Sequence, residues 1–311
     1  MNTVVTGGAG FIGSHLVDAL VAAGNHVTVL DDLSNGRQAN CSPDARLEIG
    51  SVTDADVVAE VVRDAEVVFH LGALGAVPRS LRDPLRTDAV NAHGTLTVLA
   101  CARDAGVRRL VYSSSSSVYG GASILPTPET VPARPRSPYA VSKLAGEWYC
   151  RVFAESFSLE TVSLRYFNVF GPRQRPDATY AAVIPLFTAA LLANEQPIVF
   201  GDGCQSRDFT YVDDVVNATL AAAYAPSSVN AAVFNIAPGE QHTILELIET
   251  LGEVLDMHPE PVFVDPRPGD VRHSSADATA ARTQLDWKPR TTLREGLERY
   301  VAWLRERPPP G

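Results

Sequence analysis

Tyr139 and Lys143 are the residues whose types and spacing most clearly indicate chemistry in this chain. Because they are four residues apart, a helix would place both side chains on one face, one turn apart. An ammonium group beside a phenol favours the phenolate and lowers the phenol pKa, which is otherwise about 10. The pair therefore predicts a tyrosine that acts as a general base near neutral pH. Since this spacing also arises by chance, the interpretation depends on the elements around the pair.

A glycine-rich segment near the start of the chain predicts a turn between a strand and a helix. The apolar run 3–6 precedes it, and a helical pattern over 14–20 follows it. Glycines at such a turn let the backbone approach a pyrophosphate, and the N–H groups at the helix start then face the phosphates. The segment therefore predicts a dinucleotide site. Its expected contacts are Gly7, Gly10, Phe11, Ile12 and Gly13.

The next strand pattern, 26–30, ends in an acidic residue, Asp31. An acid there accepts hydrogen bonds from a ribose hydroxyl and repels a 2′-phosphate, which favours NAD over NADP, although Arg37 nearby leaves NADP open. Asp54 follows a third strand pattern and is a candidate for a helix cap or for an acceptor at the adenine edge. Small residues after a fourth strand pattern would let the cofactor lie against the strand end. The expected cofactor contacts here are Asp31, Asp54, Leu71 and Ala73.

Strand and helix patterns alternate through this half of the chain. A helical pattern over 84–105 leads to a fifth strand pattern over 109–112. Helices of this length between strands make right-handed parallel crossovers. The sequence therefore predicts an α/β fold with a doubly wound parallel sheet of the Rossmann type, whose ligands bind at the C-terminal strand ends. Five serines, 113–117, follow the fifth strand and form either a polar loop or part of a site.

Composition limits the classes of function. A chain of 311 residues can form one or two domains, and its formal net charge of −10 argues against a nucleic-acid partner. The start of the chain lacks the pattern of a secretory signal, and no apolar run is long enough for a membrane span, so we expect a cytoplasmic protein without a membrane partner. The four cysteines lack metal-ligand or redox spacing, so we expect reduced thiols and no metal site.

In combination, the glycine turn, the serines and the Tyr-x-x-x-Lys spacing resemble the extended short-chain dehydrogenase/reductases, specifically their branch of nucleotide-sugar epimerases and dehydratases. The resemblance implies that Ser115 is catalytic together with Tyr139 and Lys143. A hydroxyl at this strand end would bridge the sugar O4 and the phenolate. The 4,6-dehydratases carry an Asp-Glu pair directly after the catalytic hydroxyl. Here Ser116 and Ser117 occupy those positions, which disfavours dehydration.

The resemblance implies a redox-neutral 4-epimerisation of a UDP-hexose. Tyr139 would take the C4 hydroxyl proton while hydride passes to the nicotinamide, and the 4-keto sugar would turn over and regain hydride on its other face. NAD would stay tightly bound and be regenerated in each turnover. Lys143 would also hold the nicotinamide ribose, so Tyr139 and Lys143 are expected cofactor contacts as well. Another chemistry on the same scaffold (a decarboxylase, dehydrogenase or reductase) and a non-catalytic NAD-sensing protein are the alternatives. The latter would have no use for the three catalytic residues together.

The same resemblance places the nucleotide-sugar contacts mainly in the second half of the chain. Arg207 and Arg272 match two arginines that clamp the diphosphate, a task that suits the fixed fork of a guanidinium. The segment 181–185 resembles one that cradles uridine, and Phe200 would stack on uracil. The expected substrate contacts are Ser115, Ser116, Asn168, Arg175, Ala182, Val183, Phe200, Arg207, Arg272 and Ser274.

Two interleaved domains follow from this arrangement. We expect residues 1–172 with about 208–240 to form the NAD-binding domain. Residues from about 173–207 with 241–311, including helices near 244–255, 276–285 and 293–305, would form a smaller α/β nucleotide-sugar domain. The predicted helices near 84–105 and 139–155 resemble the pair that forms an intermolecular four-helix bundle in this family, which implies a symmetric homodimer.

The sugar is predicted from three positions. The run 171–177 is similar to one in UDP-glucuronate 4-epimerases, in which the second arginine, here Arg175, meets the C6 carboxylate. This favours UDP-glucuronate and UDP-galacturonate. UDP-glucose or UDP-N-acetylglucosamine is the alternative, because uronate epimerases often carry Thr where Asn168 stands. Ser274 aligns with a position that gates the sugar pocket, and its small side chain leaves room for an N-acetyl group.

Overall fold

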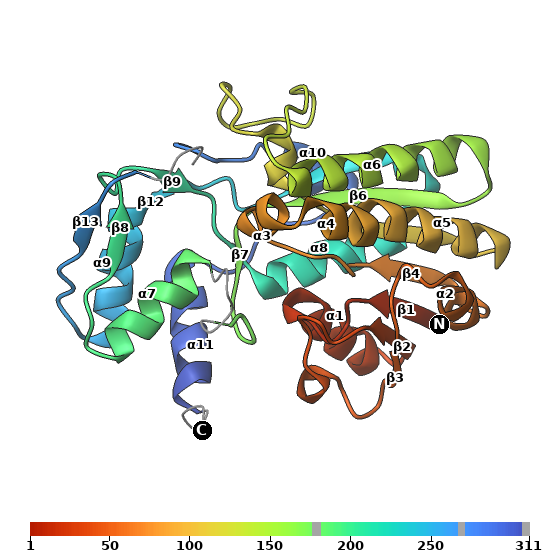
Figure 1. The fold of residues 1–311 in the computed structure, drawn as a ribbon, viewed down its shortest axis with the longest axis horizontal. Coiled ribbons are helices and arrows are strands. Elements are labelled where there is room, and N and C mark those ends of the chain that lie inside the picture. Colours follow the sequence, from red (N-terminus) through yellow and green to blue (C-terminus); the bar gives the residue numbers. More distant parts are fainter. Residues whose placement is uncertain (176–181, 267–270, 307–311) are drawn as a thin grey trace.

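The computed structural model describes residues 1–175, 182–266 and 271–306. A larger part surrounds a central sheet, and a smaller part with α7, α9 and α11 lies beside it (Figure 1). No helix in these three ranges is long and apolar enough to cross a membrane.

The central sheet has seven parallel strands in the order β11-β6-β5-β4-β1-β2-β3. The strand order reverses between β1 and β4, where the chain has crossed from one half of the sheet to the other. In such sheets this is the point at which ligands bind, outside the carboxyl ends of the strands. The predicted doubly wound fold is confirmed. The strands are β1 (Asn2–Thr6), β2 (His26–Asp31), β3 (Arg46–Ile49), β4 (Val67–His70), β5 (Arg109–Ser115), β6 (Glu160–Tyr166) and β11 (Ala232–Ile236).

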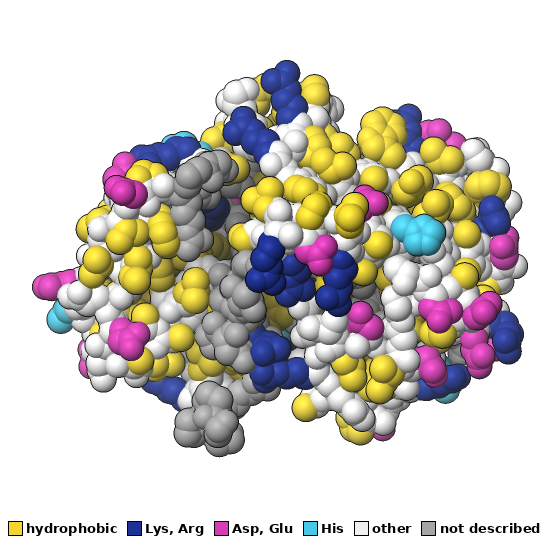
Figure 2. All heavy atoms as spheres, viewed as in Figure 1, with side chains coloured by type: hydrophobic (Ala, Val, Ile, Leu, Met, Phe, Trp, Pro, Cys, Tyr) yellow, Lys and Arg dark blue, Asp and Glu magenta, His cyan; other side chains and the backbone are white. Residues whose placement is uncertain are grey.

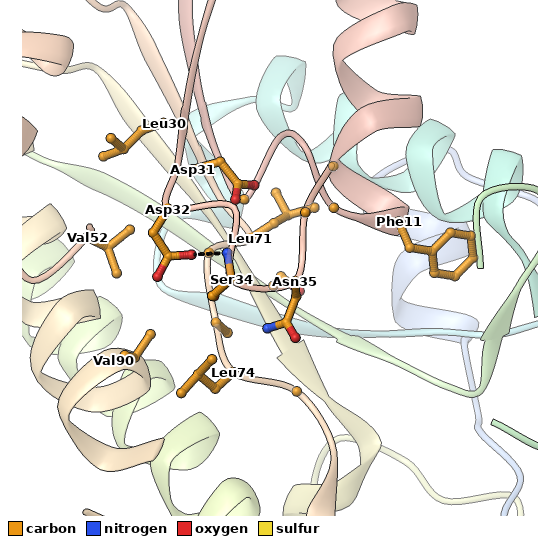
Figure 3. Close-up of a pocket in the computed structure, with 18 of the residues that line it drawn as sticks. Phe11, Leu30, Asp31, Asp32, Ser34, Asn35, Val52, Leu71, Leu74 and Val90 are labelled. Atoms are coloured by element: carbon orange, nitrogen blue, oxygen red, sulfur yellow. Dashed lines mark hydrogen bonds between the residues drawn. The ribbon is translucent and has the colours of Figure 1, made fainter. Parts of the chain in front are cut away.

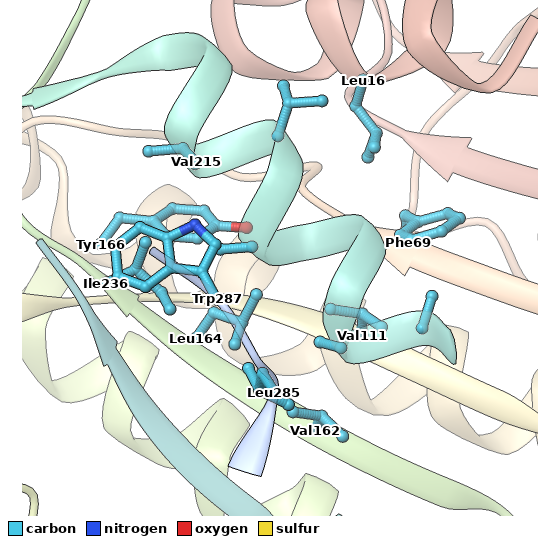
Figure 4. Packing of buried hydrophobic residues seen from close by; sticks show 14 of the residues in the cluster. Leu16, Phe69, Val111, Val162, Leu164, Tyr166, Val215, Ile236, Leu285 and Trp287 are labelled. Carbon is cyan, nitrogen blue, oxygen red and sulfur yellow. The ribbon is translucent and has the colours of Figure 1, made fainter. Parts of the chain in front are cut away.

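Helices cover both faces of the sheet, because neighbouring strand residues point to opposite sides. Val5 and Val111 pack with α1 (Phe11–Ala22) and α8 (Val212–Tyr224) on one face, which Figure 4 shows around Val215 and Trp287. Their neighbours Val4 and Leu110 pack on the other face. The helices there are α2 (Ala55–Val62), α5 (Gly94–Asp104) and α6 (Pro138–Ser156).

The helix predicted over 84–105 is divided into three segments. They are α4 (Pro84–Asp88), the π-helical turn η2 (Ala89–His93) and α5, and a further short helix, α3 (Val77–Arg82), precedes them. Within η2, the Asn91 side chain accepts the Leu74 N–H at 2.7 Å and donates to the Leu74 carbonyl at 3.1 Å. The π-helical turn therefore carries the side chain, Asn91, that holds the loop after β4 in place.

The smaller part has its own core around α7 (Val183–Leu192), α9 (Ile244–Leu255) and α11 (Leu293–Arg305). Capping boxes begin α9 and α11, which explains why both helices start where predicted. The remaining elements are β7 (Val169–Phe170), β8 (Ile198–Phe200), β9 (Ser206–Arg207), β10 (Thr210–Tyr211), β12 (His242–Thr243), β13 (Val262–Val264), α10 (Thr279–Gln284), η1 (Gln38–Asn40), η3 (Ser116–Tyr119) and η4 (Ser227–Val229).

The segment around α10 differs from its predicted place in the smaller domain. Ala281, Leu285 and Trp287 lie in the core between α8 and the sheet. The Trp287 indole N–H also donates to the Asp214 carbonyl in α8 at 2.9 Å. Burial of these apolar side chains against the sheet joins this segment to the larger part. The exact division into two domains stays a prediction.

Candidate active site

The glycine turn between β1 and α1 forms one wall of a cavity at the carboxyl end of the sheet. Gly7 has a positive φ of 72°, and a Cβ atom on Gly13 would lie 2.2 Å from the Gly7 carbonyl oxygen. Only glycines permit this tight approach. The predicted cofactor contacts that line the cavity are Gly7, Gly10, Phe11, Ile12, Gly13, Asp31, Leu71 and Ala73.

Asp31 is held in place at the end of β2. Its carboxylate accepts the Ala9 N–H at 3.0 Å and the Leu33 N–H at 2.9 Å. Burial raises the pKa of Asp31, and these two hydrogen bonds oppose that rise. Figure 3 shows Asp31 beside Asp32, whose carboxylate accepts the Ser34 N–H at 2.9 Å. The glycine turn and a fixed carboxylate at the β2 end fit the pyrophosphate and the ribose of NAD.

Asp54 has the first of its two predicted roles, that of a helix cap. Its carboxylate accepts the Asp56 and Val57 N–H groups at 3.1 and 3.3 Å at the start of α2. The residue is exposed and is not among those that line the cavity, so its contact with the cofactor stays a prediction. Ser51 and Val52, just before it, and Arg79 of α3 line the cavity but were not predicted.

The predicted catalytic residues come together where β5 meets α6. The strand continues to Ser115, so the first three serines are strand residues rather than a loop. The Ser115 hydroxyl lies close enough to the Tyr139 phenol to oppose the rise of its pKa. The Lys143 Nζ donates to the Ser113 carbonyl at 2.7 Å. Since Ser113 also lines the cofactor cavity, the group adjoins the proposed NAD site.

The expected lowering of the Tyr139 pKa by Lys143 stays a prediction, and burial acts on both groups. Burial raises the pKa of Tyr139, and the nearby Ser115 hydroxyl offsets only part of the rise. The ammonium donates to the Ser113 carbonyl and lies 5.1 Å from the centre of the Tyr112 ring. Burial also lowers the pKa of Lys143 to about 8, while the negative charge of Glu147 opposes that decrease.

A second cavity lies beside the smaller part. It is lined by predicted substrate contacts that come from distant segments, namely Asn168, Ala182, Val183, Phe200 and Arg207. Asn168 has a positive φ of 31°, and its side chain donates to the Asp208 carbonyl at 3.1 Å. The arrangement joins the loop after β6, the start of α7 and the β8–β9 segment around one space.

Arg272 lies next to this space and is bound to an acidic neighbour. It donates two hydrogen bonds to the Asp202 carboxylate, at 2.8 and 2.7 Å, and both side chains are exposed. Arg272 holds the pKa of Asp202 at about 2. Phe200 and Gln205 line both the second cavity, together with Arg207, and the adjoining space that Arg272 lines. Gln205, which was not predicted, is buried, and its Oε1 has no hydrogen-bond partner among the described residues.

Four predicted substrate contacts are not among the described residues that line these three spaces: Ser115, Ser116, Arg175 and Ser274. The Ser274 N–H donates to the Ser206 carbonyl at 3.1 Å, beside the Arg207 strand. Ser116 begins the short helix η3 after Ser115. Arg175 is the last residue of the first described range. The end of its run, 176–177, and Ala181 of the predicted uridine segment lie outside the described residues.

Comparison with known proteins identifies the family. Residues 3–237 match the model of the NAD dependent epimerase/dehydratase family. The chain is 40% identical over 314 residues to a UDP-glucose 4-epimerase of Mycolicibacterium smegmatis, and the match covers 99% of each protein.

Two solved structures have the same fold. One is a UDP-glucose 4-epimerase from Thermotoga maritima with UDP-glucose, at 40% identity and a TM-score of 0.95, covering 98% of this chain and 99% of that one. The other is a UDP-N-acetylglucosamine 4-epimerase from Methanobrevibacter ruminantium in complex with UDP-N-acetylmuramic acid, at 40% identity and a TM-score of 0.93, covering 98% of each. The chain therefore belongs to the NAD-dependent epimerase/dehydratase family, and it is an NAD-dependent epimerase.

Proposed function

We propose that the protein interconverts UDP-glucose and UDP-galactose by epimerisation at C4. The observation that carries the proposal is the cluster of Ser115, Tyr139 and Lys143 beside the cofactor cavity. Similarity to UDP-glucose 4-epimerases over almost the whole chain supports the sugar nucleotide. Dehydration has less support, because Ser116 and Ser117 carry no carboxyl group for acid–base catalysis.

The chain's own residues would perform proton transfer and positioning. NAD, held by Gly7, Gly13 and Asp31, supplies reversible hydride transfer at C4 when bound. The Tyr139 Oη would accept the C4 hydroxyl proton and return it after the ketone is reduced. Ser115, which lies next to the same phenol, would orient the sugar oxygen. The Lys143 ammonium supplies positive charge at the end of β5.

The second cavity would hold the nucleotide. Ala182 and Val183 lie at the start of α7 and would contact uridine, and the Phe200 ring would stack on uracil. Arg207 and Asn168 would bind the diphosphate by charge-assisted and neutral hydrogen bonds. Arg272 would join them after exchanging its bond to Asp202 for one to a phosphate oxygen.

A neutral C6 group is favoured by the charges of this cavity. Among its described lining residues, Arg207 is the cation, and we assign it to the diphosphate. UDP-glucuronate with UDP-galacturonate is the second candidate, because the run 171–177 is similar to that of uronate epimerases. Its carboxylate contact, Arg175, stays a prediction. An N-acetylated sugar is a third possibility, which the small Ser274 would allow.

NMR of the purified protein with each UDP-sugar in turn would test the proposal. We expect UDP-glucose and UDP-galactose to interconvert without net accumulation of NADH. Faster turnover of UDP-glucuronate, together with its loss in Arg175→Ala, would replace the proposed substrate by the uronate pair. Absence of any interconversion, in protein shown to contain NAD, would contradict 4-epimerisation itself.

We also propose that two copies form a symmetric dimer through α4, α5 and α6. Exposed apolar side chains lie on α6 and on α3 and α4 next to it: Leu81, Leu85, Val141, Trp148 and Val152. Figure 2 shows many hydrophobic side chains on this part of the surface. Burial against a second copy would remove them from water. Sedimentation should show a dimer at micromolar concentration and a monomer for Leu85→Glu with Trp148→Glu. A monomeric parent protein would refute the proposal.

A further inference from the structure

One face of α6 is matched to three consecutive serines of β5. The pairs are Tyr139 with Ser115, Lys143 with Ser113, and Glu147 with Ser114. The three α6 residues are each four positions apart, so they stand one turn above another. The first two pairs belong to the proposed catalytic group. The third is buried directly behind it and has no role in the chemistry described above.

Close packing holds this face of α6 against the strand. A Cβ atom on Gly146 would lie 2.2 Å from the Tyr112 hydroxyl oxygen, so α6 lies directly on β5 at this point. The Tyr112 hydroxyl donates to the Lys143 carbonyl at 3.4 Å. Small shifts of α6 would therefore change the position of the Lys143 ammonium relative to the strand end.

Glu147 is fixed by more than its serine. Arg165 in β6 donates to both carboxylate oxygens, at 2.9 Å from Nε and 2.7 Å from Nη2, and both side chains are buried. The Arg165 guanidinium lies 4.7 Å from the centre of the Tyr119 ring, and the Tyr119 hydroxyl donates to Asn235 Oδ1 at 2.7 Å. The carboxylate thus has a single, well-supported orientation.

Burial disfavours the charged forms of the other titratable groups that pack around Lys143 from β4, β5 and α6. Burial lowers the pKa of His70 in β4 to about 3 and raises that of Cys150 in α6 to about 12. Burial also raises the pKa of Tyr112 in β5 and of Tyr139 in α6. Glu147, one helical turn from Lys143, is therefore the carboxylate whose negative charge favours the ammonium, and both side chains are buried.

We propose that Glu147 is a positioning residue: its carboxylate, held by Arg165 and Ser114, keeps the Lys143 side chain charged and fixed against Ser113. The ion pair with Arg165 then serves the active site as well as the sheet. The inference rests on the proposed role of Lys143 in the reaction. The experiment that tests it, however, measures the protonation of Lys143 directly.

The chain has only two lysines, Lys143 and Lys288, which permits a direct measurement. In a Lys288→Arg background, lysine labelled with ¹³C at Cε gives one NMR signal, whose shift follows the protonation of Lys143. We expect Glu147→Gln to lower the midpoint of this titration by about one pH unit or more, because a buried counter-charge is lost. The alkaline limb of the epimerase kcat profile should move in the same direction.

Glu160→Gln is the matched control. Glu160 accepts two hydrogen bonds from Arg109, at 2.9 and 2.6 Å, at the opposite end of β5 and β6. It should leave the Lys143 midpoint unchanged. If Glu147→Gln leaves the midpoint unchanged, or if Glu160→Gln moves it equally, the proposal is wrong. Failure of the parent protein to epimerise would contradict the proposed function and leave the NMR result intact.

The single substitution leaves the Arg165 guanidinium buried beside a neutral amide, which can unfold a protein. A second variant, Glu147→Gln with Arg165→Met, removes both charges and keeps side chains of similar size. It should fold and still show the lowered midpoint. A folded double variant with the parent midpoint would also overturn the proposal.

Discussion

The two cavities of the site are held together in different ways. On the cofactor side, the glycine turn and the Asp31 carboxylate are fixed by the backbone of the sheet and its loops. On the nucleotide-sugar side, Arg272 is bound to Asp202 at the surface, and Arg207 donates to the Ser206 and Arg272 carbonyls at 2.9 and 3.4 Å.

This difference indicates what binding requires on each side. The cofactor side already has the shape and the acceptor that a dinucleotide needs, so NAD can remain bound through many turnovers. On the other side, existing polar contacts must be exchanged for contacts to phosphate. Substitutions in the cofactor side and the catalytic group should therefore change NAD retention or kcat, and those in the nucleotide-sugar side should change KM.

Tyr139→Phe should give the largest effect. It removes only the phenolic oxygen, so we expect kcat to fall about a thousandfold because the acid–base group is lost. NAD content, measured from the absorbance of the denatured protein, should stay at the parent level. Turnover close to that of the parent protein would show that Tyr139 is not the base.

Gly13→Ala should damage the cofactor side. Its Cβ atom would lie 2.2 Å from the Gly7 carbonyl oxygen, so the turn must open. We expect NAD affinity, measured by calorimetry on protein stripped of NAD, to weaken about a hundredfold.

The control for this variant is Gly24→Ala, at the other end of α1. Gly24 has a positive φ of 76° and no atom within 4 Å of an added Cβ. It should cost about 1 kcal/mol of unfolding free energy and leave NAD affinity unchanged. Equal NAD affinity in both alanine variants would contradict a tightly formed turn at Gly13.

Arg207→Gln should act on the nucleotide-sugar side. Loss of charge-assisted hydrogen bonds to the diphosphate should raise KM about tenfold, with kcat little changed. Steady-state kinetics and inhibition by UDP would measure this, and both constants should weaken together. A decrease in kcat at unchanged KM would place Arg207 in the chemical step instead.

Asp202→Asn should give the smallest effect, and in the opposite direction. It removes the surface partner of Arg272, so the arginine can bind the diphosphate without first breaking its ion pair with Asp202. We expect KM for the UDP-sugar to fall about twofold, and less at high salt, where surface pairs are screened. An increase in KM would mean that Asp202 holds Arg272 in its binding position.

Local patterns in the sequence were sufficient for much of this protein. The glycine turn, Asp31 at the end of β2, and the starts of α9 and α11 depend on neighbours within a few residues. The Tyr139–Lys143 spacing needed only a helix, which Ser137 and Pro138 begin. Such features depend on backbone geometry and periodicity, which short stretches of sequence specify.

Tertiary structure decided how these elements act on one another. The direction of the Lys143 ammonium depends on the Ser113 carbonyl of β5, and burial between α6 and β5 raises the pKa of Tyr139. Likewise, Arg272 is bound to Asp202, seventy positions earlier in the chain. α10 joined the sheet because its apolar side chains could be buried there. Contacts between distant segments carry no local periodic pattern, so packing and charge pairing in the folded chain determined them.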